Sequence, residues 1–553
     1  MKLRYLPLVV FSFYCTSLFS QQKSSAVLPR PKLVVGLVVD QMRWDFLYRY
    51  YERYGSRGFK RLLNEGFSCE NTQIGYVPTY TACGHASLYT GSVPSVNGIA
   101  GNDWIVQSSG YRLYCTEDTS VQSVGTTSRA GRMSPKNLLS STITDELKLA
   151  TNFRSKVIGI ALKDRGGILP AGHSADAAYW YDDLTGNWIT STYYRANLPL
   201  WVEEFNNRRL VENQENYKWE TLYPLATYKQ SSPDNSSRYE GKYRNETTAA
   251  FPHDIWAGRT AGWGAIRNTP FANTYTLDFA KKAIESEQMG KGDFTDFLAV
   301  SLSSTDYIGH QFGPNSVEVE DTYLRLDRDI AGFLSYLDKV VGKGEYTIFL
   351  SADHGAAHNP NFLSDHKIPA GVWNTTNNSS RGLEELNGIL SKKYGSDKVV
   401  RSLFNYQVHF NYPLINEKGL DINQIKKDVI SYYKSQVNVS YVVDLKNIGN
   451  EPIPEVLKAR IIHGYNEKRS GEIQIITNPG YYQGSGTEVT GTTHGTWNPY
   501  DTHIPLVFMG WGIKQGKTNR LTSMSDVAST LSALLHIQEP NGNIGQPIIE
   551  VLK

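Results

Sequence analysis

The chain has 553 residues, 40% of them hydrophobic and 20% charged, with a formal net charge of +2. This composition supports a large buried core and excludes a disordered chain, and the length fits either several small domains or one large domain with insertions. The near-neutral charge gives no support for a protein that wraps nucleic acid or adheres to a membrane surface, since both depend on concentrated positive charge.

The first 20 residues have the pattern of a secretory signal peptide. A short basic start precedes a mostly apolar stretch from Leu6 to Phe19, and the chain then turns polar. The apolar stretch is short for a membrane-spanning helix, and no later run is long and apolar enough to cross a bilayer. We therefore expect residues 1–20 to be removed and residues 21–553 to form an exported protein, periplasmic or secreted, without a membrane span.

Three cysteines remain after the signal peptide, namely Cys69, Cys83 and Cys115. An odd number cannot all pair within one chain, and an oxidising compartment permits one disulfide. Cys69–Cys115 is the candidate pair. Cys83 lies two residues after Thr81 and is its rival as a nucleophile. No sulfatase-type motif, with Pro and Arg at fixed positions after the cysteine, follows Cys83, so we expect Cys83 to be structural.

The first predicted strand covers residues 32–39 and is rich in valine, as expected of a strand buried on both faces of a parallel sheet. It ends at Asp40. Because ligands collect beyond the carboxyl ends of strands in open α/β sheets, Asp40 is a candidate metal ligand. An ordinary helix N-cap is an equally good interpretation of Asp40 taken alone. A helix is expected next, over residues 59–65.

Thr81 follows a proline-containing loop and precedes a run of small residues that suits a helix. It would lie at or near the helix N-cap, where free N–H groups and the helix dipole favour an anion. A hydroxyl at an anion site points to phosphoryl or sulfuryl transfer rather than acyl transfer. Considered alone, however, a threonine at this place is more often only a cap. Thr79 is the other hydroxyl in the loop.

Candidate phosphate ligands follow Thr81 in the chain. Asn102 lies in a Gly/Asn-rich turn and could donate its amide N–H to a substrate oxygen. A further buried strand is predicted over residues 156–162, after a helix over residues 142–149. Lys163 and Arg165 come just beyond that strand and could clamp a dianion. A plain turn and a solvated loop are the competing interpretations of these two segments.

Two long segments interrupt the alternation of strands and helices. From about residue 171 to 273 the alternation of predicted strands and helices is lost, and we expect an insertion of hairpins and loops that covers the face of the protein carrying the candidate site. The tryptophans of this segment suggest an aromatic-lined surface above the site. A second mixed insertion is expected at about 392–471. Between and after the insertions, the sequence predicts helices at 274–287, 318–339 and 525–535 and strands at 296–302, 346–352 and 504–510.

Further candidate metal ligands lie at or near these later strands: Asp306, His310, Asp353, His354 and His494. Asp306 and His310 are four residues apart, close enough to hold one metal from a loop or a first helical turn. Together with Asp40, three aspartates and three histidines are enough for two zinc ions, since mixed carboxylate and imidazole ligation suits zinc better than magnesium. Bound zinc would also activate the Thr81 hydroxyl.

The chain resembles the alkaline phosphatase superfamily, in particular the periplasmic PafA-type enzymes that use threonine as nucleophile. The similarity runs over nearly the whole mature chain and is densest at residues 33–45, 98–104, 304–307 and 351–358. The resemblance implies an α/β fold with a central, mostly parallel sheet flanked by helices and carrying inserted cap and loop regions. It also implies a monomer.

The resemblance further implies a role for each candidate residue. Asp306, His310 and His494 would hold one zinc, and Asp40, Asp353, His354 and the Thr81 oxygen would hold the other. Asn102, Lys163 and Arg165 would bind phosphate. The expected activity is hydrolysis of small phosphate monoesters through a phosphothreonine intermediate at Thr81, with two zinc ions per chain.

Three other functions compete with this one. A nucleotide pyrophosphatase/phosphodiesterase would share the ligands and the threonine, but two extra cations at Lys163 and Arg165 favour a monoester, whose dianion carries more charge than a diester. A non-catalytic phosphate- or metal-binding export protein would not need Thr81 beside a full ligand set. A cofactor-independent phosphoglycerate mutase is more distant, because that family uses serine and is cytosolic.

Overall fold

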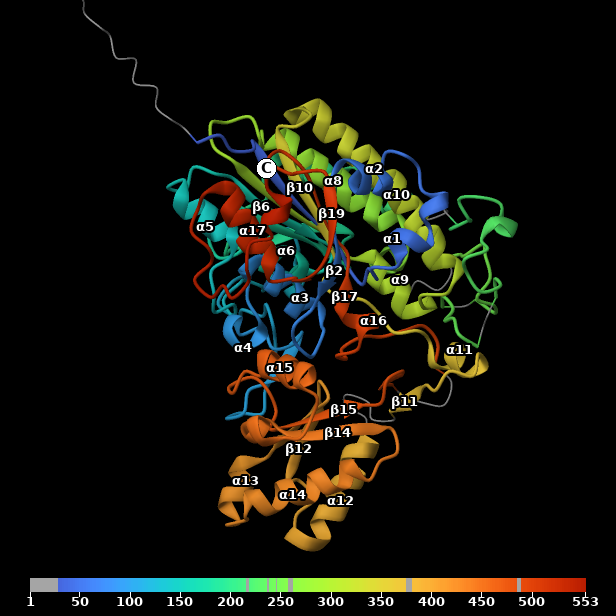
Figure 1. Ribbon diagram of the computed structural model, residues 1–553, viewed down its shortest axis with the longest axis vertical. Helices are drawn as coiled ribbons and strands as arrows, with labels where there is room; N and C mark the ends of the chain where they lie inside the picture. The colour runs from blue at the N-terminus through green and yellow to red at the C-terminus, as the bar shows by residue number, and fades with distance from the viewer. Residues whose placement is uncertain are drawn as a thin grey trace, which may run out of the picture.

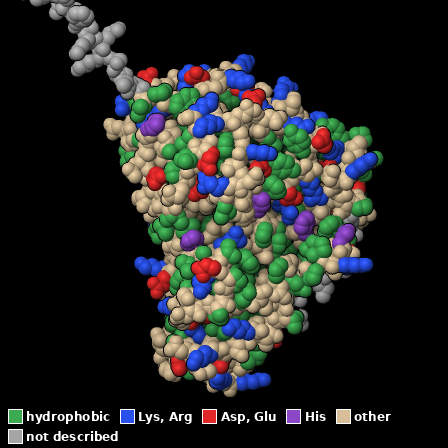
Figure 2. Space-filling model, viewed as in Figure 1, with side chains coloured by type: hydrophobic (Ala, Val, Ile, Leu, Met, Phe, Trp, Pro, Cys, Tyr) green, Lys and Arg blue, Asp and Glu red, His purple; other side chains and the backbone are tan. Residues whose placement is uncertain are grey.

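A computed structural model describes residues 28–214, 218–235, 238–244, 246–256, 262–373, 380–484 and 489–553. The predicted signal peptide lies outside the described residues. Among the helices that the structure describes, none combines the length and the apolar character needed to cross a membrane. On the face drawn in Figure 2, cationic and anionic side chains are interspersed, in keeping with the small net charge.

A large twisted sheet forms the centre of the molecule (Figure 1), with the strand order β17-β2-β18-β10-β1-β9-β6-β7-β8-β5 and β19 beside β2. Its five middle strands are parallel: β10 (Tyr346–Ser351), β1 (Leu33–Val39), β9 (Asp296–Leu302), β6 (Val157–Ala161) and β7 (Ala177–Asp182). Every residue of these strands is buried. Burial on both faces explains why their sequences are continuous apolar runs rather than alternating ones.

Antiparallel strands complete both sides of the sheet. On one side lie β18 (Leu506–Gly510), β2 (Phe67–Gln73) and β17 (His503–Ile504), and on the other side lie β8 (Asn187–Ser191) and β5 (Ser123–Val124). One further strand, β19 (Gly516–Ser523), pairs with β2 and is parallel to it. The sheet therefore continues through β7 and β8, within the segment where the sequence suggested an insertion from residue 171. The apolar and aromatic residues of β7 pair with β6, a long-range contact that local sequence rhythm does not reveal.

Helices cover both faces of the sheet (Figure 1). The main ones are α2 (Phe59–Glu65), α3 (Thr81–Thr90), α5 (Ile143–Ala150), α6 (Asp164–Ala171), α8 (Phe271–Ser286), α9 (Ser304–Phe312), α10 (Val317–Leu337) and α17 (Asp526–Leu535). Helices α3, α5, α6 and α17 pack together on one face, and α2, α8, α9 and α10 lie on the other. A π-helical turn, Asp338–Gly342, extends α10.

The segment after β8 contains little regular structure apart from α7 (Leu200–Asn207). Its aromatic residues are mostly core rather than a surface above the site. Trp219 is fully buried against α10, where its indole N–H donates to Asp321 at 2.7 Å, and Trp188, which belongs to β8 itself, is fully buried and stacks on Phe279 with the ring centroids 4.4 Å apart. Burial of such large side chains explains how a loop-rich segment stays ordered.

A second module forms the lower lobe in Figure 1. It contains a four-stranded sheet, in the order β12 (Val400–Phe404), β13 (Gln407–Phe410), β15 (Ile473–Thr477) and β14 (Val439–Asp444), with α12 (Ser380–Tyr394), α13 (Tyr412–Glu417), α14 (Ile422–Lys434) and α15 (Glu455–Gly464). The sheet, α12 and α14 share a hydrophobic core separate from that of the large sheet. Strands β11 (Gly371–Trp373) and β16 (Tyr481–Gln483) pair where the chain enters and leaves the module. The module thus reaches beyond the predicted range 392–471 at both ends.

The three described cysteines are free and buried, so the candidate Cys69–Cys115 disulfide is wrong. Cys69 lies on β2 in the main core, whereas Cys115 packs in a separate cluster with Trp104. The compartment argument permitted a bridge but carried no information about the distance between these two thiols. Burial raises the pKa of Cys83 to about 12, which keeps that thiol protonated and unreactive at neutral pH.

Candidate metal centre and nucleophile

The sheet order brings four charged side chains together at one edge. Asp353, Asp40, Asp306 and Lys163 follow the neighbouring parallel strands β10, β1, β9 and β6. The Lys163 Nζ lies 2.7 Å from Asp40 Oδ2 and also contacts Asp306 Oδ2. All four side chains are buried. The strand-end rule thus places residues that are up to 313 positions apart in the chain at one point in space.

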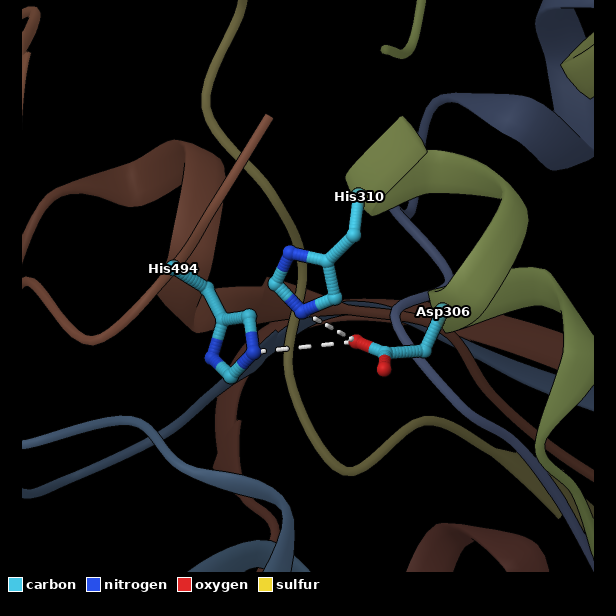
Figure 3. A group of neighbouring side chains, drawn as sticks. All are labelled: Asp306, His310 and His494. Carbon is cyan, nitrogen blue, oxygen red and sulfur yellow. Dashed lines mark ion pairs between the residues drawn. The ribbon is translucent and has the colours of Figure 1, made fainter. Parts of the chain in front are cut away.

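Asp306, His310 and His494 form the first group that could hold a metal ion (Figure 3). The Nε2 atoms of His310 and His494 lie 3.1 Å and 3.6 Å from Asp306 Oδ1. Asp306 and His310 are one helical turn apart on α9, so they face the same side, and His494 reaches them from the loop before α16 (Pro499–Thr502). This is the spacing that the sequence indicated.

The three histidines are oriented alike by their Nδ1 atoms. Each Nδ1 pairs with a backbone carbonyl oxygen: His310 with Thr492 at 2.9 Å, His354 with Gly355 at 2.9 Å and His494 with Thr79 at 2.6 Å. Because a carbonyl can only accept, Nδ1 carries the proton and Nε2 keeps its lone pair. This is the outer-shell arrangement that prepares a histidine to ligate a metal.

Asp40, Asp353, His354 and Thr81 form a second group. The His354 Nε2 lies 3.5 Å from Asp40 Oδ1, 3.3 Å from Asp353 Oδ2 and 3.3 Å from Thr81 Oγ1. Asp306 also lies near Asp40 and His354, so the two groups are adjacent. Asp40 Oδ1 and Asp353 Oδ2 are buried without a hydrogen-bond partner among the described residues. Two orphaned carboxylate oxygens beside an imidazole lone pair fit a bound cation.

The electrostatics of the second group also fit a cation. Burial, together with the charge of Asp40, holds the pKa of Asp353 well above its usual value. Burial lowers the pKa of His354 to about 4, which favours its neutral, ligating form. A divalent cation between these side chains would stabilise the ionised carboxylates and so offset the effect of burial on their pKa values, because a bound ion is the largest local charge in such a site.

Thr81 is the first residue of α3, and Tyr80 occupies the N-cap without a side-chain cap hydrogen bond. Thr81 is therefore no cap, and its hydroxyl faces His354 instead. The small residues after it allow a close approach between α3 and the end of β10: a Cβ on Gly84 would lie 2.2 Å from the backbone oxygen of Asp353. This close packing places Thr81 among the second group.

Thr79, the other hydroxyl in the loop, has a structural role. Its Oγ1 donates to the carbonyl of Thr496 at 2.9 Å, and its own carbonyl accepts from the Nδ1 of His494. Thr79 thus ties the loop before α3 to the loop that carries His494, and the Thr79 hydroxyl is already engaged. Of the two threonines, Thr81 is therefore the one whose hydroxyl faces the candidate metal ligands.

Asn102, Lys163 and Arg165 lie around the N-terminus of α3, not in solvated loops. Asn102 Oδ1 accepts from the backbone N–H of Ala82 at 2.9 Å, which leaves its amide N–H groups for another acceptor. Lys163 is the N-cap residue of α6 and Arg165 lies in its first turn. The Arg165 Nη1 donates to the hydroxyl of Tyr114 at 2.9 Å. The cations therefore occupy fixed positions beside Thr81's helix.

Two buried side chains beside these groups were missed at the level of sequence. His85, one turn after Thr81 on α3, is fully buried; its Nδ1 lies 2.9 Å from the Thr81 carbonyl and its Nε2 lies 2.8 Å from Ser301 Oγ on β9. The four-residue spacing from Thr81 was an available signal. Gln41 follows Asp40 and contacts carboxylates of both groups. No signal other than its position marked it.

Comparison with known proteins agrees with this geometry. The family described as type I phosphodiesterase / nucleotide pyrophosphatase matches residues 34–501. The chain is 52% identical to "Alkaline phosphatase PafA" of Elizabethkingia meningoseptica, over 97% of each chain, and 57% identical to a Myroides odoratus protein named "Calcium-transporting ATPase", over 96% of each.

A crystal structure of wild-type alkaline phosphatase PafA superposes on this chain with a TM-score of 0.92 and 53% identity, covering 95% of this chain and all of that one. The predicted α/β fold with a large central sheet flanked by helices is confirmed, with parallel pairing among the five middle strands and mostly antiparallel pairing toward both edges. The resemblance to PafA-type enzymes is also confirmed. The chain therefore belongs to the type I phosphodiesterase / nucleotide pyrophosphatase family.

Proposed function

We propose that this protein is an exported, monomeric alkaline phosphatase that hydrolyses small phosphate monoesters and uses Thr81 as nucleophile. The observation that carries the proposal is the position of the Thr81 hydroxyl, 3.3 Å from the Nε2 of His354 and beside two buried carboxylate oxygens that lack partners among the described residues. The name and near-complete coverage of the Elizabethkingia relative support the same activity.

Two zinc ions fit the donors. Asp306, His310 and His494 would hold one, and Asp40, Asp353, His354 and the Thr81 oxygen would hold the other. Nitrogen and carboxylate donors in sets of three or four are typical of zinc. When bound, zinc lowers the pKa of a hydroxyl group or water that it ligates and offsets negative charge on phosphoryl oxygens.

The chain's own residues then carry two successive displacements. In the first, Thr81 Oγ1 forms a bond to phosphorus, the bond from phosphorus to the ester oxygen breaks, and the alcohol leaves with a proton. In the second, water attacks the phosphothreonine, the Thr81 hydroxyl is restored and inorganic phosphate leaves. His354 fixes the direction of the Thr81 hydroxyl, and α3 presents its N-terminus to the phosphoryl group.

Asn102, Lys163 and Arg165 would neutralise the phosphoryl oxygens that do not react. Lys163 faces Asp40 and Asp306 and can turn one N–H toward substrate, and Arg165 is oriented by Tyr114. Two cations at this place favour a monoester dianion over a diester, which carries one negative charge and an added substituent. A phosphodiesterase, the activity named by the family description, is therefore the less favoured function.

The decisive experiment compares a monoester and a diester with the same leaving group on the purified protein, with zinc quantified in the same sample. We expect the monoester to react faster and two zinc ions per chain. A faster diester, or a protein that holds no zinc, would overturn the proposal. ATP, tested with and without calcium, covers the activity that the name of the Myroides relative implies.

Thr81→Ala and Thr81→Ser separate the nucleophile from the fold. We expect Thr81→Ala to abolish turnover and Thr81→Ser to retain much of it, because serine keeps the hydroxyl that attacks phosphorus. Labelled phosphate trapped on the wild-type chain by acid quench, and absent from Thr81→Ala, would identify the intermediate. Full turnover by Thr81→Ala would leave only a binding role for this residue.

A further inference from the structure

Gln41, the residue after Asp40, has a backbone conformation that needs an explanation. Its φ angle is +63°, in the left-handed region, although it is not glycine. That conformation is strained for a residue with a Cβ and persists only where surrounding contacts compensate for it. The side chain is 4% exposed, so the compensating contacts are internal.

The backbone of Gln41 contacts the second group of ligands. Its N–H donates to Asp353 Oδ1 at 3.0 Å, and the N–H of His354 donates to the same oxygen at 3.0 Å. With Oδ1 held by two backbone donors, Asp353 presents Oδ2 toward the Nε2 of His354. The left-handed conformation of Gln41 thus accompanies a backbone N–H that points to this carboxylate.

The side chain of Gln41 contacts the first group. Its Nε2 donates to Asp306 Oδ1 at 2.7 Å, the oxygen that also faces His310 and His494. Because an ionised carboxylate can only accept, this contact fixes which end of the amide points to Asp306. One residue thus holds one carboxylate from each group, through its main chain and its side chain respectively.

Helix α9 leaves a space for this amide at Gly309, between Asp306 and His310. A Cβ added to Gly309 would lie 2.0 Å from Gln41 Oε1, 3.0 Å from its Cδ and 3.7 Å from its Nε2, and these are the three nearest atoms. The φ angle of Gly309 is not in the left-handed region, so glycine is required there for space and not for backbone freedom. Gln41 and Gly309 therefore form a fitted pair.

We propose that Gln41 is a positioning residue that couples the two metal sites, holding Asp306 and Asp353 in their ligating orientations, and that Gly309 is required to admit it. The inference rests on the proposed two-zinc function. It assigns a role to a side chain that touches neither substrate nor the reacting atoms. The expected consequence of losing the amide is weaker zinc retention, because partners of metal ligands contribute roughly 10–100-fold to metal affinity.

The test is Gln41→Gly, with zinc affinity measured by competition with a chelator. Glycine adopts the left-handed conformation without strain, so the variant keeps the backbone link to Asp353 and removes only the link to Asp306. Gln288→Gly is the matched control, since Gln288 also has a positive φ, +52°, and is exposed beyond the end of α8. We expect a 10–100-fold loss of affinity in Gln41→Gly and no loss in Gln288→Gly.

A double-mutant cycle with Gly309→Ala makes the test specific. Alone, Gly309→Ala should weaken zinc binding about as much as Gln41→Gly, because its methyl group displaces the amide. In the Gln41→Gly background the same change should add little, since the atoms nearest to the new methyl are gone. Additive losses, or a Gln41→Gly protein that is folded by circular dichroism and binds zinc like wild type, would overturn the inference. Wild type without zinc would instead overturn the proposed function and the inference with it.

Discussion

The two halves of the proposed site, one assigned to metal and one to phosphate, are built in different ways. The metal-binding half takes its carboxylates from the ends of neighbouring parallel strands, and its histidines from the same segments or from a loop tied to them. The phosphate half includes Asn102, and Tyr114 which orients Arg165, from the excursion around β3 (Asp103–Ile105) and β4 (Arg112–Tyr114). Within the described part of the chain, these two strands pair with each other and lie outside the central sheet.

The second module supports that excursion. At the tip of the β12–β13 hairpin, the Nδ2 of Asn405 donates to the carbonyl of Asp103 at 2.9 Å. Arg401 and Arg469 donate from their guanidinium groups to the carbonyls of Gln107, at 2.9 Å, and Gly98, at 2.6 Å. The sheet and the segments that directly follow its strands thus position the proposed metal ligands, apart from Thr81 on α3 and His494 on its loop, whereas the segment around Asn102 is also held by a module inserted some 300 residues later in the chain.

Removing a ligand from the metal half should have the largest effect. Asp353→Asn replaces a buried carboxylate that has one unpartnered oxygen with a neutral amide, so the second zinc loses both a ligand and a balancing charge. We expect loss of one zinc per chain and a fall in monoester turnover well beyond the ~100-fold typical of outer-shell changes. Metal analysis measures the zinc content, and kcat/KM for the monoester measures the fall in turnover. Asp293→Asn, at an exposed loop position, is the control.

An Asp353→Asn protein that keeps both metals and its turnover would break the comparison, because the strand-end carboxylate would then be dispensable.

The phosphate half should respond without metal loss. Arg165→Ala removes a cation from the phosphoryl oxygens, where such a cation is worth on the order of 10³-fold in rate. Zinc content should stay at the wild-type value, and diester hydrolysis should fall less than monoester hydrolysis. Tyr114→Phe should give a smaller loss in the same direction, because it removes only the hydroxyl that accepts from Arg165. Equal losses on both substrates would count against the clamp.

The contribution of the module can be measured at Asn405. Asn405→Gly keeps the left-handed turn, where φ is +56°, and removes the side chain that donates to Asp103. One net hydrogen bond is worth about 1 kcal/mol, so a five- to tenfold loss of monoester kcat/KM is expected, with zinc unchanged. Asn152→Gly, also in the left-handed region and exposed, is the matched control.

If Asn405→Gly instead lost zinc, the module would support both halves of the site and the distinction between them would fail.

The same difference explains what the sequence could and could not predict. Val-rich runs that end in Asp or in Asp-His located the strands and their carboxylates, because a parallel sheet brings such ends together whatever the length of the connections. Tyr114 and Asn405 could not be found in this way. Their roles depend on contacts between loops, and Asn405 touches a residue 302 positions away.

Two further failures have similar causes. Nothing in the sequence measures the distance between Cys69 and Cys115, and the pairing of β7 with β6 was hidden because β7 opens a segment whose later part is irregular. Gln41 was missed for a different reason, since an amide carries no metal-ligand signature and its conformation is visible only in three dimensions.

The smallest effect on turnover is expected outside both halves, at His253 in the segment that packs on α10. Its ring lies between Glu246, 3.2 Å away, and Glu318, 3.0 Å away, with Asp234 nearby. Burial lowers the pKa of His253, but the hydrogen bonds and charges of the two glutamates outweigh it and raise the pKa to about 9.

Because the pKa of His253 is higher in the folded state than in the unfolded chain, where it is ~6.5, protonation of His253 stabilises the folded protein. This contribution is complete below pH ~6.5 and is lost as the pH rises through about 9. Wild type should therefore lose on the order of 3 kcal/mol between pH 7 and pH 10 through this group, at about 1.4 kcal/mol per pKa unit. His253→Gln should have a lower Tm than wild type at pH 7, and the two Tm curves should converge by pH 10. Parallel Tm curves would show that a group other than His253 causes the loss of stability at high pH. Convergence of the curves, with zinc content unchanged, would place the cause of that loss in the segment packed on α10, apart from both halves of the site.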